Sequence, residues 1–114
     1  RDRHIHVKGG ADRFRDFVYI DDVANAFRLL EERGERHAVY NVATGTKTFV
    51  GDLVSSIQAS LPYDTTSLFE GATPGDQHGI VGDARKILEE TGWAPHVSMS
   101  EGLRKMIAWA LEGR

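Results

Sequence analysis

The sequence has 114 residues, enough for one domain spanning residues 1–114, and its 40% hydrophobic and 27% charged residues exclude a disordered tail. A net charge of −3 gives no overall positive field for nucleic acid, and no apolar run approaches the ~20 residues of a membrane span. The absence of cysteine excludes disulfides and thiolate chemistry and agrees with a reducing compartment, so we expect a cytoplasmic protein. Because the chain begins with Arg1, we expect it to be processed or to be a piece of a longer protein.

Short strands and helices alternate along the chain. Polar–apolar alternation and β-branched residues predict strands over 4–7, 15–20, 38–43 and 66–69, with a very short one at 80–81. Helices are expected from a cap at Asp21 or Asp22 to about residue 32, from a cap at Thr48 to residue 61, over 84–91, and from Ser98 onward. These elements predict a mixed α/β fold with about four helices and one small sheet of roughly three to five strands.

Apolar positions with helical spacing identify the expected core. In the first helix the apolar face consists of Val23, Ala26, Phe27 and Leu30. In the last helix, Ser98 to Glu101 fits the S-x-x-E capping box. Trp93 and Trp109 are expected to pack the final helices onto the sheet, because indole rings bury a large area.

The inventory of catalytic groups is small. The sequence has no G-x-S-x-G nucleophile elbow and neither of the common glycine-rich phosphate loops. His4 and His6 share one face of a strand, but no third ligand lies nearby in sequence, so we interpret them as surface residues and predict no metal site. Asp21 and Asp22 are adjacent at a helix start, where capping is favoured over a catalytic carboxylate pair.

Basic residues are concentrated at the N-terminal end, which indicates a local anion site; they are Arg1, Arg3, Lys8, Arg13 and Arg15. Arg13 and Arg15 are alternate residues of an extended segment, so their side chains are expected on one side. Two guanidinium groups there would form a diphosphate clamp. The alternative is a solvated basic edge that discourages strand aggregation. The pattern alone leaves both interpretations open.

Five motifs occur in an order typical of one family. They are R-D-F-V-Y-I-D-D-V at 15–23, V-Y-N-V-A-T-G at 39–45, P-G-D at 74–76, the stretch from D-A-R-K at 83–86 to G-W-A-P at 92–95, and E-G-L at 101–103 leading to Trp109. Together they resemble the C-terminal, substrate-binding portion of extended short-chain dehydrogenase/reductases, the NAD-dependent nucleotide-sugar epimerases and dehydratases. The match is most similar to members that resemble UDP-glucose 4-epimerase.

The resemblance implies a substrate-binding role for six residues. By this similarity Arg15 would bind the diphosphate, Phe17 would pack near the nucleotide, Thr46 would line the base pocket and Asp76 would accept from the ribose hydroxyls. Ile80 falls where some members place an aromatic residue. The family's second phosphate-binding arginine falls at Thr73 here; Arg13 is a candidate to replace it, and the alternative is that the substrate differs.

The resemblance also implies what this stretch lacks. The family's N-terminal half carries a glycine-rich NAD turn and a Tyr-x-x-x-Lys catalytic pair, and this sequence has neither. We therefore expect no catalytic residue, no cofactor-binding residue and no activity in the isolated chain. Its expected partners are a UDP-sugar, the dinucleotide-binding half with its NAD, and a second copy docked through exposed apolar surface. The alternative function is a free-standing nucleotide-binding or protein-interaction module.

Overall fold

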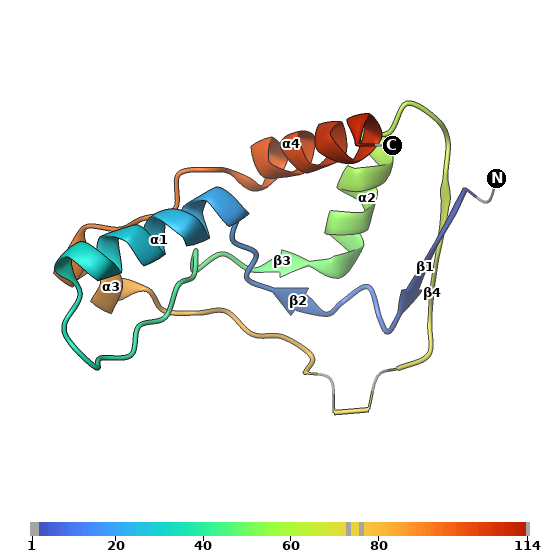
Figure 1. Cartoon of the computed structure of the whole chain (residues 1–114). Helices are drawn as coiled ribbons and strands as arrows, with labels where there is room; N and C mark the ends of the chain where they lie inside the picture. The colour runs from blue at the N-terminus through green and yellow to red at the C-terminus, as the bar shows by residue number, and fades with distance from the viewer. Residues whose placement is uncertain (1–2, 73, 76, 114) are drawn as a thin grey trace.

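The computed structural model describes residues 3–72, 74–75 and 77–113 and contains four helices linked by short strands and long connections (Figure 1). The helices are α1 (Ile20–Arg33), α2 (Val50–Ser60), α3 (Arg85–Thr91) and α4 (Met99–Glu112). The strands are β1 (His4–Lys8), β2 (Phe14–Arg15), β3 (Thr48–Phe49) and β4 (Thr66–Glu70). The predicted mixed α/β architecture with four helices is confirmed.

The strands form two separate pairs, whereas we expected one sheet. β1 and β4 run parallel, with His4 opposite Thr66 and Lys8 opposite Glu70, and we call this pair the β1–β4 ribbon. β2 and β3 are antiparallel, with Arg15 opposite Thr48. The strand predicted over 15–20 is therefore wrong beyond Arg15, because its remaining residues bond to loops and to the start of α1. Residues 80–81 form no strand either.

Helix ends follow local signals at some sites and tertiary packing at others. Ser98 caps α4 by accepting a hydrogen bond from the Glu101 N–H at 3.2 Å, as predicted. The predicted caps of the first two helices are wrong. α1 begins at Ile20, ahead of both aspartates, and Thr48 pairs in β3 while Phe49 precedes α2 without a side-chain cap. α3 ends at Gly92, whose φ of 80° is left-handed and favours glycine.

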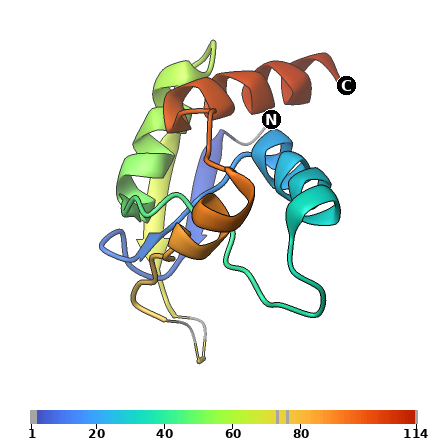
Figure 2. The same ribbon diagram turned by 90° about the vertical axis from the view of Figure 1, so that its left-hand side faces the viewer.

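The main core lies between α1 and α3, which pack together with the segment after α3 (Figures 1 and 2). Ala26, Leu29, Ile87 and Trp93 are its buried members. The predicted core role of Trp93 is confirmed, since only 1% of it is exposed. The corresponding prediction for Trp109 is wrong, because 75% of it is exposed on α4. We call this part of the molecule the α1–α3 end.

Apolar surface is left uncovered beside this core. Phe27, predicted in the buried face of the first helix, is 66% exposed, because the helix turns Asp22, Ala26 and Leu29 inward instead. The predicted strand over 38–43 is also wrong. The structure assigns no strand there, and Val39 is 81% exposed. A strand needs a neighbour for its backbone groups, and none of the described segments pairs with this one.

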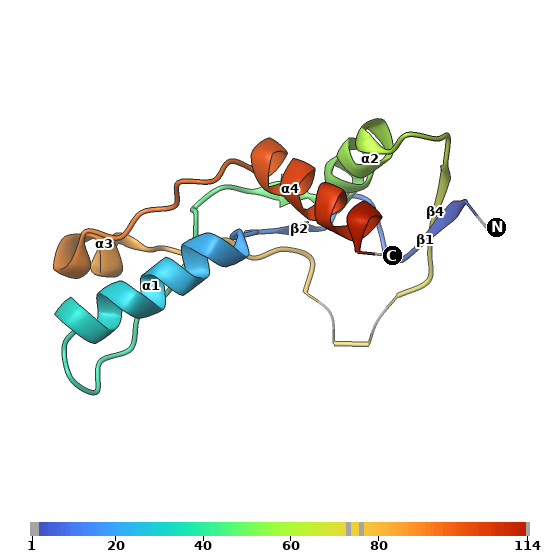
Figure 3. The same cartoon turned by 45° about the horizontal axis from the view of Figure 1, so that its top comes forward.

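The molecule is flat and long. Its axes extend 49 × 34 × 19 Å, and Figure 3 shows α4 lying between α1 and α2. The radius of gyration is 16.6 Å, whereas a compact domain of this length has a value of about 13 Å. None of the described helices combines the length and apolar character needed to cross a membrane.

Candidate functional site

The short β2–β3 ladder is the meeting point of three distant segments. Phe14 pairs with Phe49 and Arg15 with Thr48. On the other side of β2, the Phe14 N–H donates to the His78 carbonyl at 3.0 Å, and Phe14 forms a parallel bridge with Gly79. A Cβ on Gly79 would lie 2.1 Å from the Phe14 ring, so this close approach requires glycine. The ladder therefore brings residues 14–15, 48–49 and 78–79 together.

A single carboxylate joins the same segments. Asp16 accepts hydrogen bonds from the Thr44 N–H at 2.9 Å, the Gly45 N–H at 2.8 Å and the Gly82 N–H at 3.1 Å. The Thr44 hydroxyl also donates to Asp16. We call these four residues the Asp16 cluster. Because Thr44 and Gly82 lie far from Asp16 in sequence, the cluster holds the approach to β3 and the approach to α3 against β2.

The electrostatics of the Asp16 cluster favour the charged carboxylate. Burial alone raises the pKa of Asp16, but the hydrogen bonds from Thr44, Gly45 and Gly82 stabilise the anion more strongly. The pKa of Asp16 therefore lies below its usual range. These donors occupy the acceptor positions of the carboxylate, so its role here is to hold the backbone in place.

Asp22, at the start of α1, also holds a distant backbone segment through its carboxylate. It is 4% exposed, and its carboxylate accepts from the backbone N–H groups of His96 and Val97 at 3.1 and 3.0 Å. Its backbone carbonyl accepts from the Trp93 indole N–H at 2.9 Å. These bonds fix the connection between α3 and α4. Asp22 is therefore neither the predicted helix cap nor half of a catalytic pair with exposed Asp21.

The fixed segments form the wall of a cavity of about 560 Å³ beneath α2 and α4. Its lining is mostly apolar and comes from 17–19, α2, the segment 95–98 and α4. Four hydroxyl-bearing residues are part of the lining, Thr44, Thr46, Thr48 and Ser98. An apolar cavity with a few oriented polar groups is the usual form of a small-molecule site. Phe17 and Thr46, two of the six predicted substrate-binding residues, both line it.

The other predicted residues have distinct positions. Arg15 lies on β2 and donates from one guanidinium nitrogen to the Phe14 carbonyl at 2.7 Å. Arg13 turns back on the β1–β2 connection, where its guanidinium donates to the Lys8 carbonyl at 2.8 Å and the Gly10 carbonyl at 3.2 Å. Ile80 is 54% exposed, directly after the bridge residue Gly79. Asp76 and Thr73 lie outside the described residues.

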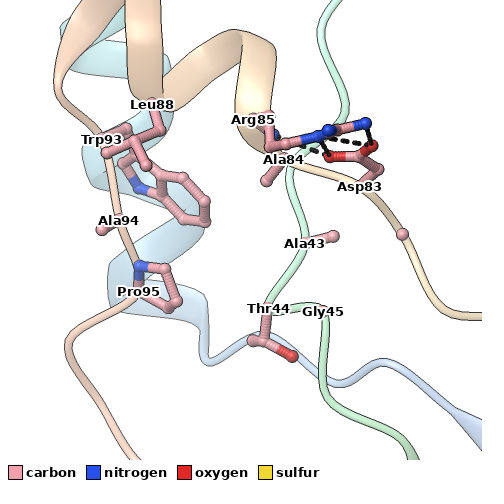
Figure 4. Close-up of a pocket in the computed structure, with 11 residues that line it drawn as sticks. Ala43, Thr44, Gly45, Asp83, Ala84, Arg85, Leu88, Trp93, Ala94 and Pro95 are labelled. Carbon is pink, nitrogen blue, oxygen red and sulfur yellow. Dashed lines mark hydrogen bonds and ion pairs between the residues drawn. The ribbon is translucent and has the colours of Figure 1, made fainter.

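A second cavity of about 310 Å³ lies toward the α1–α3 end and is shown in Figure 4. Trp93 and Pro95 line one side of it, and the backbone of 43–45 lines another. Asp83 and Arg85 pair with each other at 2.7 Å, and both side chains are largely exposed. None of the five predicted substrate-binding residues that the structure describes lines this cavity.

Two features are missing, a cluster of metal ligands among the described residues and a common NAD-binding motif in the sequence. Within 3–72, 74–75 and 77–113, no three histidine, aspartate or glutamate side chains gather as metal ligands. His4 and His6 are exposed, and His4 contacts Thr66 across the ribbon. No Tyr-x-x-x-Lys pair or G-x-G-x-x-G turn occurs in the sequence, so we assign none of its residues to NAD.

Asp16 and Asp22 are the site-organising residues that sequence reasoning missed. Both lie within the 15–23 motif, in which the sequence predicted a phosphate-binding role for Arg15 and a helix cap at Asp21 or Asp22. An acidic residue inside an otherwise apolar and aromatic stretch was the available signal, because such a carboxylate needs hydrogen-bond donors when it is buried. The sequence could not tell which donors they are, since they lie far along the chain.

Comparison with known proteins relates this arrangement to enzymes of nucleotide-sugar metabolism. A family model described as GDP-mannose 4,6 dehydratase matches residues 1–106. The chain is 32% identical to UDP-glucose 4-epimerase of Thermotoga maritima, solved with UDP-glucose, with a TM-score of 0.90 over 96% of this chain and 35% of that one. It is 25% identical to MoeE5, solved with UDP-glucuronic acid and NAD, with a TM-score of 0.89 over 97% of this chain and 38% of that one.

A multifunctional plant enzyme is also related. The chain is 30% identical over 111 residues to the trifunctional UDP-glucose 4,6-dehydratase/UDP-4-keto-6-deoxy-D-glucose 3,5-epimerase/UDP-4-keto-L-rhamnose-reductase of Arabidopsis thaliana, covering 95% of this chain and 16% of that protein. This chain therefore spans about a third of the two solved relatives and less of the plant enzyme. The chain belongs to the GDP-mannose 4,6-dehydratase family of extended short-chain dehydrogenase/reductases, and it corresponds to part of the C-terminal side of such an enzyme.

Proposed function

We propose that this chain binds the nucleotide diphosphate of a nucleotide-sugar, a UDP-sugar in the first instance, as the substrate-binding part of an NAD-dependent epimerase or dehydratase. The observation that carries the proposal is the convergence of residues 14–15, 48–49 and 78–79 at the β2–β3 ladder. Next to this meeting point, Phe17, Thr46 and Thr48 line one largely apolar cavity, and Arg15 lies on β2.

Each residue has a physical role in this proposal. The Arg15 guanidinium binds the diphosphate through charge-assisted hydrogen bonds, which planar guanidinium groups form well with phosphate. Phe17 and Thr46 contact the nucleoside where they line the large cavity. Arg13 is the second candidate for the diphosphate, and it would have to exchange its bonds to the Lys8 and Gly10 carbonyls for bonds to phosphate. Ile80 supplies apolar contact.

The chemical step belongs, in this proposal, to a partner half that holds NAD. That half would supply the hydride acceptor and the tyrosine and lysine that this chain lacks. The isolated chain is therefore expected to bind nucleotide without turning over substrate. Incubation with NAD and UDP-galactose tests this directly, and any epimerised or dehydrated product would contradict it.

The binding experiment is a calorimetric titration of the chain with UDP, UMP and UDP-glucose. Binding is expected to be tighter for UDP than for UMP, because only UDP presents a diphosphate. Arg15→Ala is expected to weaken UDP binding by about tenfold or more, the size of one hydrogen bond to a charged group.

Arg104→Ala on the exposed side of α4 is the matched control, since it removes the same charge away from the ladder. It is expected to leave UDP affinity within about twofold of the original, as surface charges remote from a site contribute little. Equal losses in the two variants would mean that UDP responds only to net charge, and the proposed site would be wrong. Titrations with GDP-mannose and dTDP-glucose then establish which base is preferred.

A second candidate function is a free-standing interaction module, and the exposed apolar surface favours it. Ile20 and Phe27 on α1 are each 66% exposed, and Val39 is more exposed still. Large apolar side chains uncovered in this way favour association, with the NAD-binding half or with a second copy of the chain. Light scattering over a concentration series tests self-association, and Phe27→Lys is expected to shift the mass toward the monomer. A monomer at every concentration would exclude the homodimer.

A further inference from the structure

Asp16 connects the segments of the proposed site through the hydrogen bonds that its carboxylate accepts. It lies between Arg15 and Phe17 in sequence, and its carboxylate reaches the two other segments that converge on β2. One carboxylate oxygen accepts from the Gly45 and Gly82 N–H groups, and the other accepts from both donors of Thr44. Every acceptor position is therefore directed at backbone or hydroxyl groups of the protein and not at the cavity.

The first connection leads to Thr46. The Thr44 hydroxyl donates its hydrogen to Asp16, and the same oxygen accepts the Thr46 N–H at 3.0 Å. Asp16 is thus linked through one hydroxyl to the backbone of a residue that lines the large cavity. The labelled Thr44 and Gly45 in Figure 4 mark the bend at which this link is made. Gly45 has a φ of 76°, a conformation that leaves its N–H free to point at Asp16.

The second connection leads to Ile80. The Gly82 N–H donates to Asp16 two residues after Ile80. A Cβ on Gly82 would lie 2.5 Å from the Ala43 side chain, so glycine allows this segment to press against 43–45. The bridge of Gly79 to Phe14 holds the same loop from its other side. Residues 80 and 81 are therefore held at both ends.

We propose that Asp16 is a positioning residue for nucleotide binding, which sets the relative placement of Arg15, Thr46 and Ile80 without touching the ligand. This proposal rests on the proposed function. The positioning role adds to that function a distinction between the residues that contact the nucleotide and the residue that holds them in place. Preorganisation of this kind raises affinity because the binding groups lose less freedom when the ligand arrives.

The experiment compares Asp16→Asn with Asp83→Asn in the same chain. Asparagine keeps the size of aspartate, but its amide nitrogen cannot accept, so at least one set of donors in the Asp16 cluster loses its acceptor. Asp83 is a matched control because it also accepts hydrogen bonds, from Arg85, at a solvent-exposed position. UDP affinity is measured by calorimetry, folding by circular dichroism, and the amide signals of residues 44–46 and 80–82 by NMR.

We expect Asp16→Asn to weaken UDP binding about tenfold, because Arg15, Thr46 and Ile80 are then no longer held in place before the ligand arrives, with Asp83→Asn within about twofold of the original chain. The amide signals of Thr46 and Ile80 should shift in Asp16→Asn before any ligand is added. Equal UDP affinity in the two variants would overturn the positioning role and leave the proposed function intact. Absence of UDP binding in the unmodified chain would overturn both.

A second pair of variants decides the matter if Asp16→Asn does not fold. Thr44→Ser keeps the hydroxyl that links Asp16 to Thr46, and Thr44→Val removes it with little change in volume. We expect the serine variant to bind UDP nearly as the original does and the valine variant to bind several-fold more weakly. Equal affinities for these two variants would overturn the link. If Thr44 acted only through the packing of its methyl group, valine would replace it better than serine. The amide signal of Thr46 would then change less in the valine variant than in the serine variant.

Discussion

The α1–α3 end and the β1–β4 ribbon are stabilised in different ways. At the α1–α3 end, apolar burial dominates, with Trp93, Ile87 and Ala26 almost completely enclosed. In the ribbon, backbone pairing dominates, and side chains such as Leu68 remain 47% exposed. The proposed nucleotide site lies between the two, on β2 and β3. The contrast teaches that this chain obtains most of its stability away from the residues that we propose for binding.

The largest expected effect comes from Trp93→Ala. Removing a fully buried indole should lower the free energy of unfolding by about 3–5 kcal/mol, because both burial and packing are lost. Denaturant unfolding followed by circular dichroism measures it. Trp109→Ala is the matched control and should change stability by less than about 0.5 kcal/mol, since that indole is 75% exposed. Similar losses in the two variants would remove the basis of the comparison.

Asp22→Asn tests whether polar contacts also concentrate at the α1–α3 end. Both backbone N–H groups, of His96 and Val97, donate to one oxygen of Asp22, so asparagine can keep these bonds only as neutral ones, which are weaker than charge-assisted bonds, at a site only 4% exposed. We expect a loss of about 1–3 kcal/mol in unfolding free energy. Asp21→Asn, one residue earlier and exposed, should be nearly neutral. If both variants unfold alike, the carboxylate of Asp22 contributes nothing specific.

Leu68→Ala examines the ribbon. Because nearly half of Leu68 is exposed, we expect a decrease of no more than about 1 kcal/mol, below the range for buried leucine. The parallel backbone pairing should survive, which hydrogen exchange of the β4 amides measures. A loss as large as that of Trp93→Ala would show that the ribbon carries a core of its own.

The contribution of the Asp16 cluster to the stability of the fold should depend on pH. The folded pKa of Asp16 lies below its unfolded value of about 3.9, so its contribution is complete above that pH and is lost as the pH falls through the folded pKa. The difference in melting temperature between the original chain and Asp16→Asn should therefore be constant from pH 7 to 5 and should shrink below pH 4. A difference that stays constant down to pH 3 would contradict this assignment. We expect it to be the smallest effect.

Local signals in the sequence predicted elements whose cause is local. The cap at Ser98 and the glycine after α3 depend on neighbouring residues, and the structure contains both. The segment 38–43 has the composition of a buried strand, but composition does not supply a pairing partner. Phe27 and Trp109 were assigned to the core because apolar residues usually are, although periodicity does not say which face meets a neighbour.

The sequence predicted two of the residues that line the candidate cavity, but it did not predict how the cavity is held together. The resemblance named Phe17 and Thr46, and the structure brings both to one cavity. Pattern reasoning treated Arg13 and Arg15 as a pair, but the Arg13 guanidinium bonds to carbonyls of its own turn. The Asp16 cluster was not predictable, because its donors are separated from Asp16 by up to 66 residues.

The parallel pairing of β1 with β4 has a consequence for the order of folding. His4 and Thr66 are 62 positions apart, so β1 can pair with β4 only after Thr66 and the residues that follow it have been synthesised. Closing such a long loop costs entropy before any contact repays it, whereas α1 needs only residues close to it in sequence. The pairing of β1 with β4 is therefore expected to form late, and a ribosome-bound chain that stops before Thr66 would lack it.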